Sequence, residues 1–187
     1  MLRGLRTLVP CIVWLMTWCA SGAGAVVFDR ADAAFTRCLD GDWRFKLVNA
    51  GSERGLVDAF ARPDFDDSGW SAISVPSNWE MKGLEDARYF RPDPAKYGLY
   101  RLKCEIPDEW RGRSLWLHFD GVLFAYTVYV NGTEAGSFSH AYLPAQFDIT
   151  PFVGADSRTV TIAVKVVRNL RESQFDTNDC WALSGIY

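Results

Sequence analysis

The sequence contains little histidine and no excess of basic residues. Only His118 and His140 occur among its 187 residues, too few for a histidine-based metal site, and both are expected to be ordinary surface or strand residues. Lys plus Arg number 20 against 23 Asp plus Glu, which gives a formal net charge of −3, and there is no long basic run. Because nothing in this balance would hold nucleic-acid phosphates, we expect no nucleic-acid partner.

Cysteine is also scarce, with 5 residues at wide spacings. Cys11 and Cys19 lie in an N-terminal segment that we expect to be removed, which leaves Cys38, Cys104 and Cys180. An odd number of widely spaced cysteines is neither a disulfide framework nor a zinc-site pattern. Pairing of two of the three in an oxidising compartment stays open.

Residues 1–25 have the composition of a secretory signal peptide. Two arginines precede an almost wholly apolar stretch at 8–20, and the small residues that follow place Ala23 and Ala25 in the A-x-A relation that signal peptidase recognises. The stretch is short for a membrane span and no stop-transfer charges follow it, so a retained anchor is the less favoured alternative. We expect cleavage before Val26, a secreted or periplasmic protein, and no membrane attachment after cleavage.

The rest of the chain lacks a helical apolar stripe over three turns, and the best helical candidate, residues 55–61, is short. Apolar and polar residues alternate with a period of two instead, which is typical of strands with one buried face. This pattern predicts strands at residues 43–47, 100–106, 115–119, 124–130 and 160–166, with shorter extended pieces at 73–75 and 146–149.

Asn131-Gly132 directly follows one of these alternating segments. Both residues tolerate a positive φ, so Asn-Gly between two extended runs is a strong hairpin signal. Short strands joined by Gly, Pro, Asp and Asn clusters, without a linker or an internal repeat, favour one all-β domain over residues 26–187. We therefore predict an antiparallel β-sandwich in which two packed sheets bury the apolar faces. Four tryptophans are expected in the core or on a sheet face: Trp43, Trp70, Trp116 and Trp181.

Four islands of sequence combine turns with aromatic residues, and their order and spacing carry more information than any one of them. They are Leu39-Asp40-Gly41-Asp42-Trp43-Arg44-Phe45; Asp66-Asp67-Ser68-Gly69-Trp70 with Val75-Pro76-Ser77-Asn78-Trp79-Glu80; the run from Gly98-Leu99-Tyr100-Arg101 through Phe119-Asp120-Gly121-Val122 to Phe147-Asp148-Ile149-Thr150; and residues 176–187. With these islands, the chain from Leu39 to Tyr187 resembles the N-terminal sugar-binding domain of family 2 glycoside hydrolases. That family includes β-galactosidases, β-glucuronidases and β-mannosidases.

The resemblance implies a jelly-roll sandwich of the galactose-binding-domain type, in agreement with the strand pattern. The closing stretch Asp179-Cys180-Trp181-Ala182-Leu183-Ser184-Gly185-Ile186 is most similar to the β-galactosidase branch, where Asp-x-Trp-x-x-Ser-Gly-Ile ends the domain. In that branch the matching aspartate reaches into the active site, binds sugar hydroxyls and helps to hold a monovalent cation. The resemblance therefore makes Asp179 a substrate-binding residue and a ligand for sodium in the full enzyme. Turn and cap roles for Asp176 and Asp179 are the alternative that the residues alone leave open.

Three further residues are candidate substrate contacts. Trp79, with Asn78 beside it in a Pro-Ser-Asn loop, is the tryptophan expected nearest to a ligand. Arg91 falls where many β-galactosidases carry an Asn that touches the substrate, so the chain departs from the pattern of the branch at this position.

The chemistry of a retaining glycosidase requires two carboxyl groups about 5 Å apart. In the family that the chain resembles, both are glutamates on a later (β/α)₈ barrel, beyond an immunoglobulin-like domain. The glutamates of this chain are expected at turns or on polar strand faces, and Glu80 and Glu85, near the presumed ligand side, have no partner evident in the sequence. We therefore expect the chain to be truncated before the catalytic domains and to be inactive alone.

The leading hypothesis is the N-terminal, non-catalytic domain of a secreted β-galactosidase-type enzyme that hydrolyses O-glycosyl bonds. It would form one wall of the sugar pocket and pack against downstream domains of the same polypeptide, with a β-galactoside or a related glycoside as ligand. The alternatives are a stand-alone carbohydrate-binding module without catalytic activity and a purely structural sandwich.

Overall fold

The computed structural model describes residues 35–49, 51–89, 96–168 and 181–187. The chain divides into two compact units, Met1–Thr36 and Arg37–Tyr187, and the fold below is that of the second. The expected signal peptide and its cleavage point lie outside the described residues. No helix among the residues that the structure describes is long and apolar enough to span a membrane.

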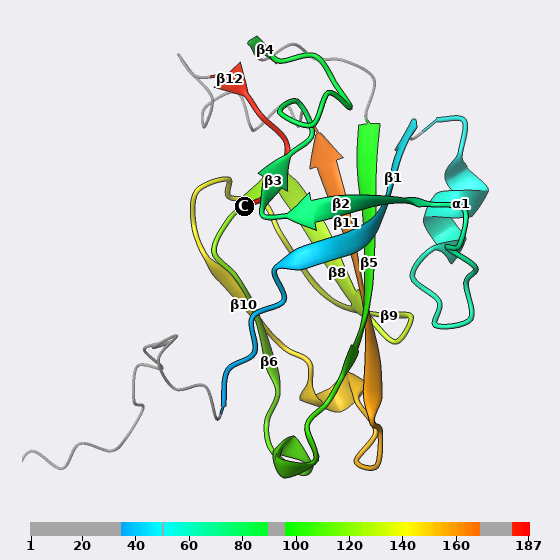
Figure 1. Ribbon diagram of the computed structural model, residues 1–187, viewed down its shortest axis with the longest axis vertical. Coiled ribbons are helices and arrows are strands. Elements are labelled where there is room, and N and C mark those ends of the chain that lie inside the picture. The colour runs from blue at the N-terminus through cyan, green and yellow to red at the C-terminus, as the bar shows by residue number, and fades with distance from the viewer. Residues whose placement is uncertain (1–34, 50, 90–95, 169–180) are drawn as a thin grey trace, which may run out of the picture. The chain divides into compact units, whose positions relative to one another are not determined.

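The described residues of the second unit consist mainly of strands, with one short α-helix and two 3₁₀ turns (Figure 1). The elements are β1 (Gly41–Asn49), α1 (Arg54–Ala59), β2 (Ser71–Val75), β3 (Ser77–Asn78), β4 (Arg88–Tyr89), β5 (Lys96–Glu105), η1 (Asp108–Trp110), β6 (Trp116–Phe119), β7 (Val122–Leu123), β8 (Ala125–Val130), β9 (Thr133–Phe138), β10 (Ala145–Asp148), η2 (Thr150–Phe152), β11 (Thr159–Arg168), β12 (Trp181–Ala182) and β13 (Gly185–Ile186).

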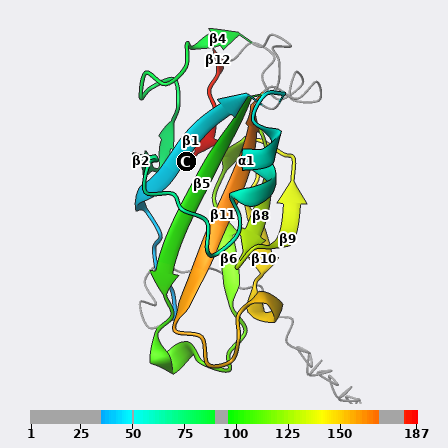
Figure 2. The ribbon, with the colours of Figure 1, turned by 90° about the vertical axis from the view of Figure 1, so that its right-hand side faces the viewer.

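One large antiparallel sheet organises these strands in the order β2-β1-β5-β11-β8-β9. Its central strand β5 pairs with β1 and β11, so that Tyr100 lies opposite both Phe45 and Val164. Two smaller antiparallel sheets, β10-β6 and β3-β13-β7, lie against one face of the large sheet, and a fourth two-stranded sheet joins β12 to β4. Figures 1 and 2 show β6 and β10 on one side of the large sheet and α1 on the other.

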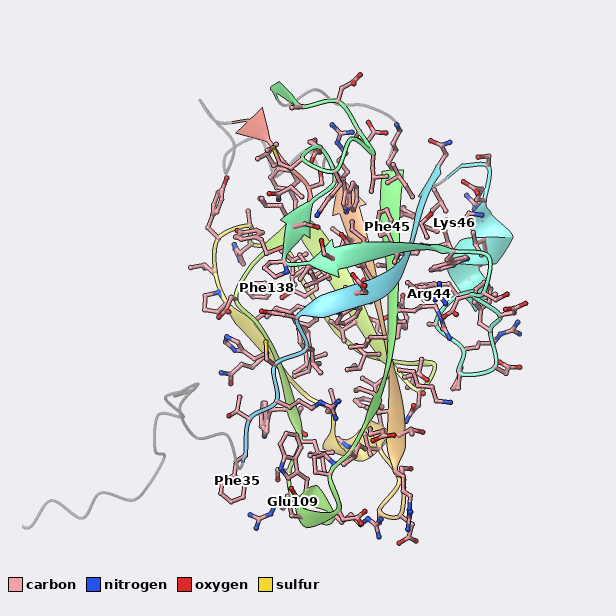
Figure 3. All side chains as sticks on the ribbon, in the orientation of Figure 1. Phe35, Arg44, Phe45, Lys46, Glu109 and Phe138 are labelled. Atoms are coloured by element: carbon pink, nitrogen blue, oxygen red, sulfur yellow. The ribbon has the colours of Figure 1, made fainter. Side chains whose placement is uncertain are left out.

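The main core fills the space between the large sheet and the smaller sheets. Alternate residues of β5, β8 and β11 meet Leu117 and Phe119 of β6, Phe147 of β10 and Ile186 of β13 in one buried cluster. The same alternation appears on β1, where Phe45 is buried while Arg44 and Lys46 are exposed (Figure 3). The predicted antiparallel β-sandwich is therefore confirmed, and its packing follows from the period-two pattern.

The outer face of the large sheet is covered by the connection between β1 and β2. Phe60, Trp70 and Leu99 form a second buried cluster, against which the apolar side of α1 packs. Arg101 of β5 holds this connection in place: its Nε donates to Asp67 Oδ2 at 2.6 Å, and its Nη1 donates to the carbonyl oxygens of Phe60 and Arg62. Only 5% of Arg101 is exposed, so a position that the alternation assigns to the polar face is in fact buried.

Each strand predicted from the sequence is present, and the 55–61 segment contains α1. The Asn131-Gly132 hairpin is also confirmed, because both residues have positive φ angles, 49° and 88°, between β8 and β9. The Asn131 side chain adds two bonds that local pattern does not predict. Its Nδ2 donates to the Phe152 carbonyl at 3.0 Å, and its Oδ1 accepts from the Thr161 amide at 2.9 Å.

The structure also places the tryptophans and cysteines that the sequence analysis named. Trp43 and Trp70 are buried in the core, and Trp116 lies on the outward face of β6, 53% exposed, so all three are in the core or on a sheet face as predicted. Cys38 and Cys104 are free thiols, and Cys180 lies outside the described residues.

A close approach between Gly98 and Trp79 generates a prediction about stability. A Cβ atom on Gly98 would lie 2.1 Å from Cζ2 of the fully buried Trp79, whereas a Cβ on Gly55 in α1 would meet nothing within 4 Å. We expect Gly98→Ala to lower the free energy of unfolding by about 1–3 kcal/mol or more through overpacking. Gly55→Ala should leave it unchanged or slightly raised. Urea unfolding of the two variants tests this, and equal stability of both would contradict it.

Candidate functional site

The chain segments that flank the predicted site residues meet at one end of the sandwich. β3 pairs with β13, which places Asn78 opposite Gly185, and β4 pairs with β12, which places Tyr89 opposite Trp181. Figure 1 shows β3, β4 and β12 at this end. Two short ladders thus bring the 77–89 and 181–187 segments side by side, although they are far apart in the sequence.

The predicted substrate contacts are distributed unevenly over the described part of the chain. Asn78 is half-buried on β3, and its carbonyl oxygen accepts a hydrogen bond from the Lys82 amide at 3.2 Å. Arg91 and Asp179 lie outside the described residues, as does Asp176. In the sequence, Arg91 comes two residues after β4 and Asp179 comes two residues before β12. Each is thus two positions away from a strand of the β4–β12 ladder.

Trp79 is a core residue and does not face a ligand, which corrects the sequence-based expectation. Its indole has no exposed area, lies 5.8 Å from the Phe45 ring between centroids, and occupies the space that Gly98 leaves open on β5. Its Nε1 donates to the Tyr100 hydroxyl at 2.5 Å. Burial raises the pKa of Tyr100, so the hydroxyl stays neutral and can accept this bond. An indole enclosed in this way has no face on which a sugar ring could stack.

Glu80, next in the sequence, connects the 79–87 segment to the C-terminal segment. Its side chain is fully buried, and Oε2 accepts a hydrogen bond from the Ser184 amide at 2.8 Å. The Trp79 amide donates to the Ser184 carbonyl at 2.8 Å, so Ser184 is bound through both of its backbone polar groups. Glu80 Oε1 lies 3.6 Å from Nη2 of Arg168, the last residue of β11.

Arg168 extends this contact into a cluster of charges, which we call the Arg168 cluster: Glu80, Glu85, Lys96 and Arg168. The side chains of Glu80, Glu85 and Arg168 are buried, and that of Lys96 is partly exposed. The Arg168 guanidinium donates from Nη1 to the Glu85 carboxylate and from Nη2 to the Asp86 carbonyl, the latter at 3.1 Å. Lys96, the first residue of β5, also binds the Glu85 carboxylate. Glu80 and Glu85, for which no partner was evident in the sequence, therefore do have partners, which come from other segments of the chain.

The sequence did carry a signal for this cluster. Val160, Ile162, Val164 and Val166 form the buried face of β11, and Arg168 continues the same parity. An arginine at an inward position must find an acidic partner, because an unpaired buried charge is strongly unfavourable. Glu80 and Glu85 are the acidic residues that meet it.

The two carboxyl groups of the cluster differ in electrostatics. Burial raises the pKa of Glu80 above its ordinary value, and this effect exceeds the opposing effects of the Ser184 amide and Arg168. Burial also acts to raise the pKa of Glu85, but its hydrogen bonds with Lys96 and Arg168 outweigh burial and lower it overall. A general acid must reach the group that it protonates, and a Glu80 side chain without exposed area does not. The cluster therefore fixes geometry at this end of the sandwich and does not provide an acid/base pair.

The other features of the described residues do not form a second chemical site. They contain no group of three or more His, Cys, Asp or Glu side chains that could hold a metal ion. A groove on the outer face of the large sheet is lined by residues that include Arg44, Asp67, Arg101 and Lys103. Two of its charged residues, Arg101 and Asp67, pair with each other. The β3–β13 and β4–β12 end, with the Arg168 cluster, is the best candidate.

Comparison with known proteins gives consistent results. The sequence matches the family described as glycosyl hydrolases family 2, sugar binding domain, over residues 36–187. It is 33% identical over 171 residues to a β-galactosidase of Psychromonas ingrahamii (85% of this chain, 16% of that enzyme) and 35% identical over 162 residues to one of Vibrio vulnificus (80% and 15%). A crystal structure of Bacteroides uniformis β-glucuronidase has a TM-score of 0.65 at 27% identity (81% and 16%). The chain thus spans less than a fifth of the length of each relative.

The opposite pKa shifts of Glu80 and Glu85 predict opposite pH dependences of stability. A raised pKa in the folded state means that stability is present below the unfolded pKa, about 4.3, and is lost as the pH rises through the folded value. Relative to Glu80→Gln, the wild type should therefore lose stability as the pH rises above the unfolded pKa of about 4.3, because the folded pKa of Glu80 is raised. Relative to Glu85→Gln, it should gain stability as the pH rises from acid, because the pKa of Glu85 is lowered. Urea unfolding at several pH values measures both trends, and trends of the same sign for the two variants would refute the assignment.

Proposed function

The chain belongs to the sugar binding domain of glycosyl hydrolases family 2, and from that premise we propose that it forms the non-catalytic wall of the sugar pocket in a secreted β-galactosidase-type enzyme. The observation that carries the proposal is the pairing of β4 with β12, the two strands from which Arg91 and Asp179 lead away. Connecting segments that continue from paired strands at the end of a sandwich commonly bind ligands.

In this proposal Asp179 binds the sugar. An ionised carboxylate accepts hydrogen bonds from two hydroxyl groups and can also ligate a hard cation such as sodium through oxygen. Arg91 can donate to a sugar hydroxyl from its guanidinium, and Asn78, half-buried on β3, can contribute at the edge of the same region. Each of these groups orients the substrate, and the two carboxyls that retaining hydrolysis requires come from another part of the polypeptide.

The proposal favours a galactoside over a glucuronide as substrate. The two relatives at 33% and 35% identity are β-galactosidases. The closing motif from Asp179 to Ile186 resembles the one that ends this domain in the β-galactosidase branch. A similar solved structure, that of a β-glucuronidase, shares 27% identity and supports the fold and the family. We also propose that residues 1–25 are a cleaved signal peptide, so that the enzyme acts in the periplasm or outside the cell.

The function is tested with two proteins, the 187-residue chain and the longest polypeptide that its gene encodes. We expect the chain alone to hydrolyse no p-nitrophenyl β-D-galactoside, because in this proposal the two carboxyls that retaining hydrolysis requires come from another part of the polypeptide. The full polypeptide should hydrolyse the galactoside in preference to the corresponding glucuronide. Turnover by the highly purified chain, or a preference for the glucuronide, would contradict the proposal. A full polypeptide that binds galactosides without hydrolysing them would favour a binding module.

The role of Asp179 is tested by Asp179→Asn in the full polypeptide. The amide keeps the size of the side chain but loses the charge and half of the accepting capacity. Hydrogen bonds to charged groups contribute about 1.5–3 kcal/mol, so kcat/KM should fall about tenfold to a hundredfold while the melting temperature stays the same. Asp176→Asn, the same change in the same segment, serves as the matched control and should have little effect. Full activity of Asp179→Asn, or loss of activity only through unfolding, would make Asp179 a structural turn residue.

A further inference from the structure

One buried carboxylate holds both flanks of the chain segment that carries Asp179. Arg168 is the last described residue before that segment, and Ser184 lies shortly after it, three residues beyond Trp181. Glu80 Oε2 accepts the Ser184 amide hydrogen at 2.8 Å, and Glu80 Oε1 lies 3.6 Å from Arg168 Nη2. The end of β11 and the start of β13 are therefore fixed relative to the same side chain.

Further contacts make the 77–86 segment the frame for both flanks. Arg168 also binds the Glu85 carboxylate and the Asp86 carbonyl, and the Ser184 carbonyl accepts from the Trp79 amide. Gly185 pairs with Asn78, at a distance where a Cβ atom on Gly185 would lie 2.3 Å from the Ser77 carbonyl oxygen. The backbones of the two segments thus approach as closely as a glycine allows.

The Arg168 cluster contains features that oppose folding. Arg168 Nε is a buried polar atom without a hydrogen-bond partner, and Glu80 Oε1 lies 3.6 Å from Arg168 Nη2, beyond hydrogen-bond distance. Unsatisfied buried polar atoms oppose folding, and an apolar cluster of the same volume often stabilises a protein as well as a buried ion pair does. What charged hydrogen bonds provide, and apolar contacts do not, is a fixed distance and direction. The cluster is thus better explained by a need for fixed geometry than by stability.

We propose that Glu80 and Arg168 are positioning residues for sugar binding, which fix the two flanks of the Asp179 segment and so determine where its side chains meet the sugar. The inference rests on the proposed function of Asp179. Neither residue touches the substrate in this proposal. Both act through the segment that they hold, in the way that supporting residues keep binding groups in a productive geometry.

The test compares two buried arginines in the full polypeptide. Arg168→Met removes the ionic contacts of the Arg168 cluster while keeping an apolar stem. Arg101→Met is the matched control, because Arg101 is also buried and pairs with Asp67 at 2.6 Å, but it holds the connection on the outer face of the large sheet. Both variants should have a lower melting temperature. Only Arg168→Met should raise KM for p-nitrophenyl β-D-galactoside, about tenfold, with kcat nearly unchanged, as expected for lost substrate binding.

A second variant and a second measurement keep the proposal falsifiable. Glu80→Gln retains an oxygen that can accept from the Ser184 amide but removes the charge opposite Arg168, so it should fold and raise KM by a smaller factor, about threefold. Amide hydrogen exchange of residues 181–187, measured in the same polypeptides, reports on the flank itself without any substrate. It should be faster in Arg168→Met than in the wild type and unchanged in Arg101→Met.

The outcomes separate this proposal from the proposed function. If the wild type hydrolyses no galactoside, or if Asp179→Asn is fully active, the proposed function fails, and with it the role in sugar binding. If Asp179→Asn loses activity while Arg168→Met and Glu80→Gln both keep the wild-type KM, the positioning role alone is wrong. An equal rise of KM in Arg101→Met, or unchanged exchange at residues 181–187 in Arg168→Met, would also overturn it.

Discussion

The guanidinium of Arg168 connects the three chain segments that meet at the candidate site. It ends β11, pairs with Glu85 and faces Glu80, whose other oxygen binds the Ser184 amide before β13. A buried charge without partners is far more unfavourable than the loss of one ordinary contact, so none of these segments can move away independently. The apolar core determines that the two layers pack. The charge of Arg168 determines how the loops at this end are arranged on top of them.

The alternation of apolar and polar residues was sufficient to predict the architecture but not the surroundings of the polar positions. Tyr100 and Phe45 occupy the inner face of the large sheet as their period requires. Arg101, on the opposite parity, is buried under the 60–67 segment by bonds to Asp67 and to main-chain carbonyls. Local sequence does not reveal such cover, because the residues that provide it lie more than thirty positions away. Two-residue strands such as β3 and β13 cannot be predicted from local sequence for the same reason, because their pairing depends on tertiary contacts.

The order of the sequence motifs was enough to predict which segments form the candidate site. It did not predict the contacts within the site. Trp79 looked accessible because it lies in a Pro-Ser-Asn loop, but its environment is set by what the facing strand lacks, a side chain at Gly98. No partner of Glu80 or Glu85 was evident in the sequence, because Ser184, Lys96 and Arg168 lie on other segments of the chain, 11 to 104 positions away. Residue types therefore indicated the family, whereas the contacts of each residue required three dimensions.

The packing of Trp79 against Gly98 has a consequence for the history of such domains. A side chain at position 98 and an indole at position 79 exclude each other, so neither position can change far on its own without passing through a poorly folded protein. Descendants of this sequence should keep the pair together or replace it together, with a smaller residue at 79 accompanying any larger one at 98. Glu80 is the residue after Trp79. Keeping Trp79 and Gly98 together therefore also keeps the backbone position from which the Glu80 carboxylate binds the Ser184 amide.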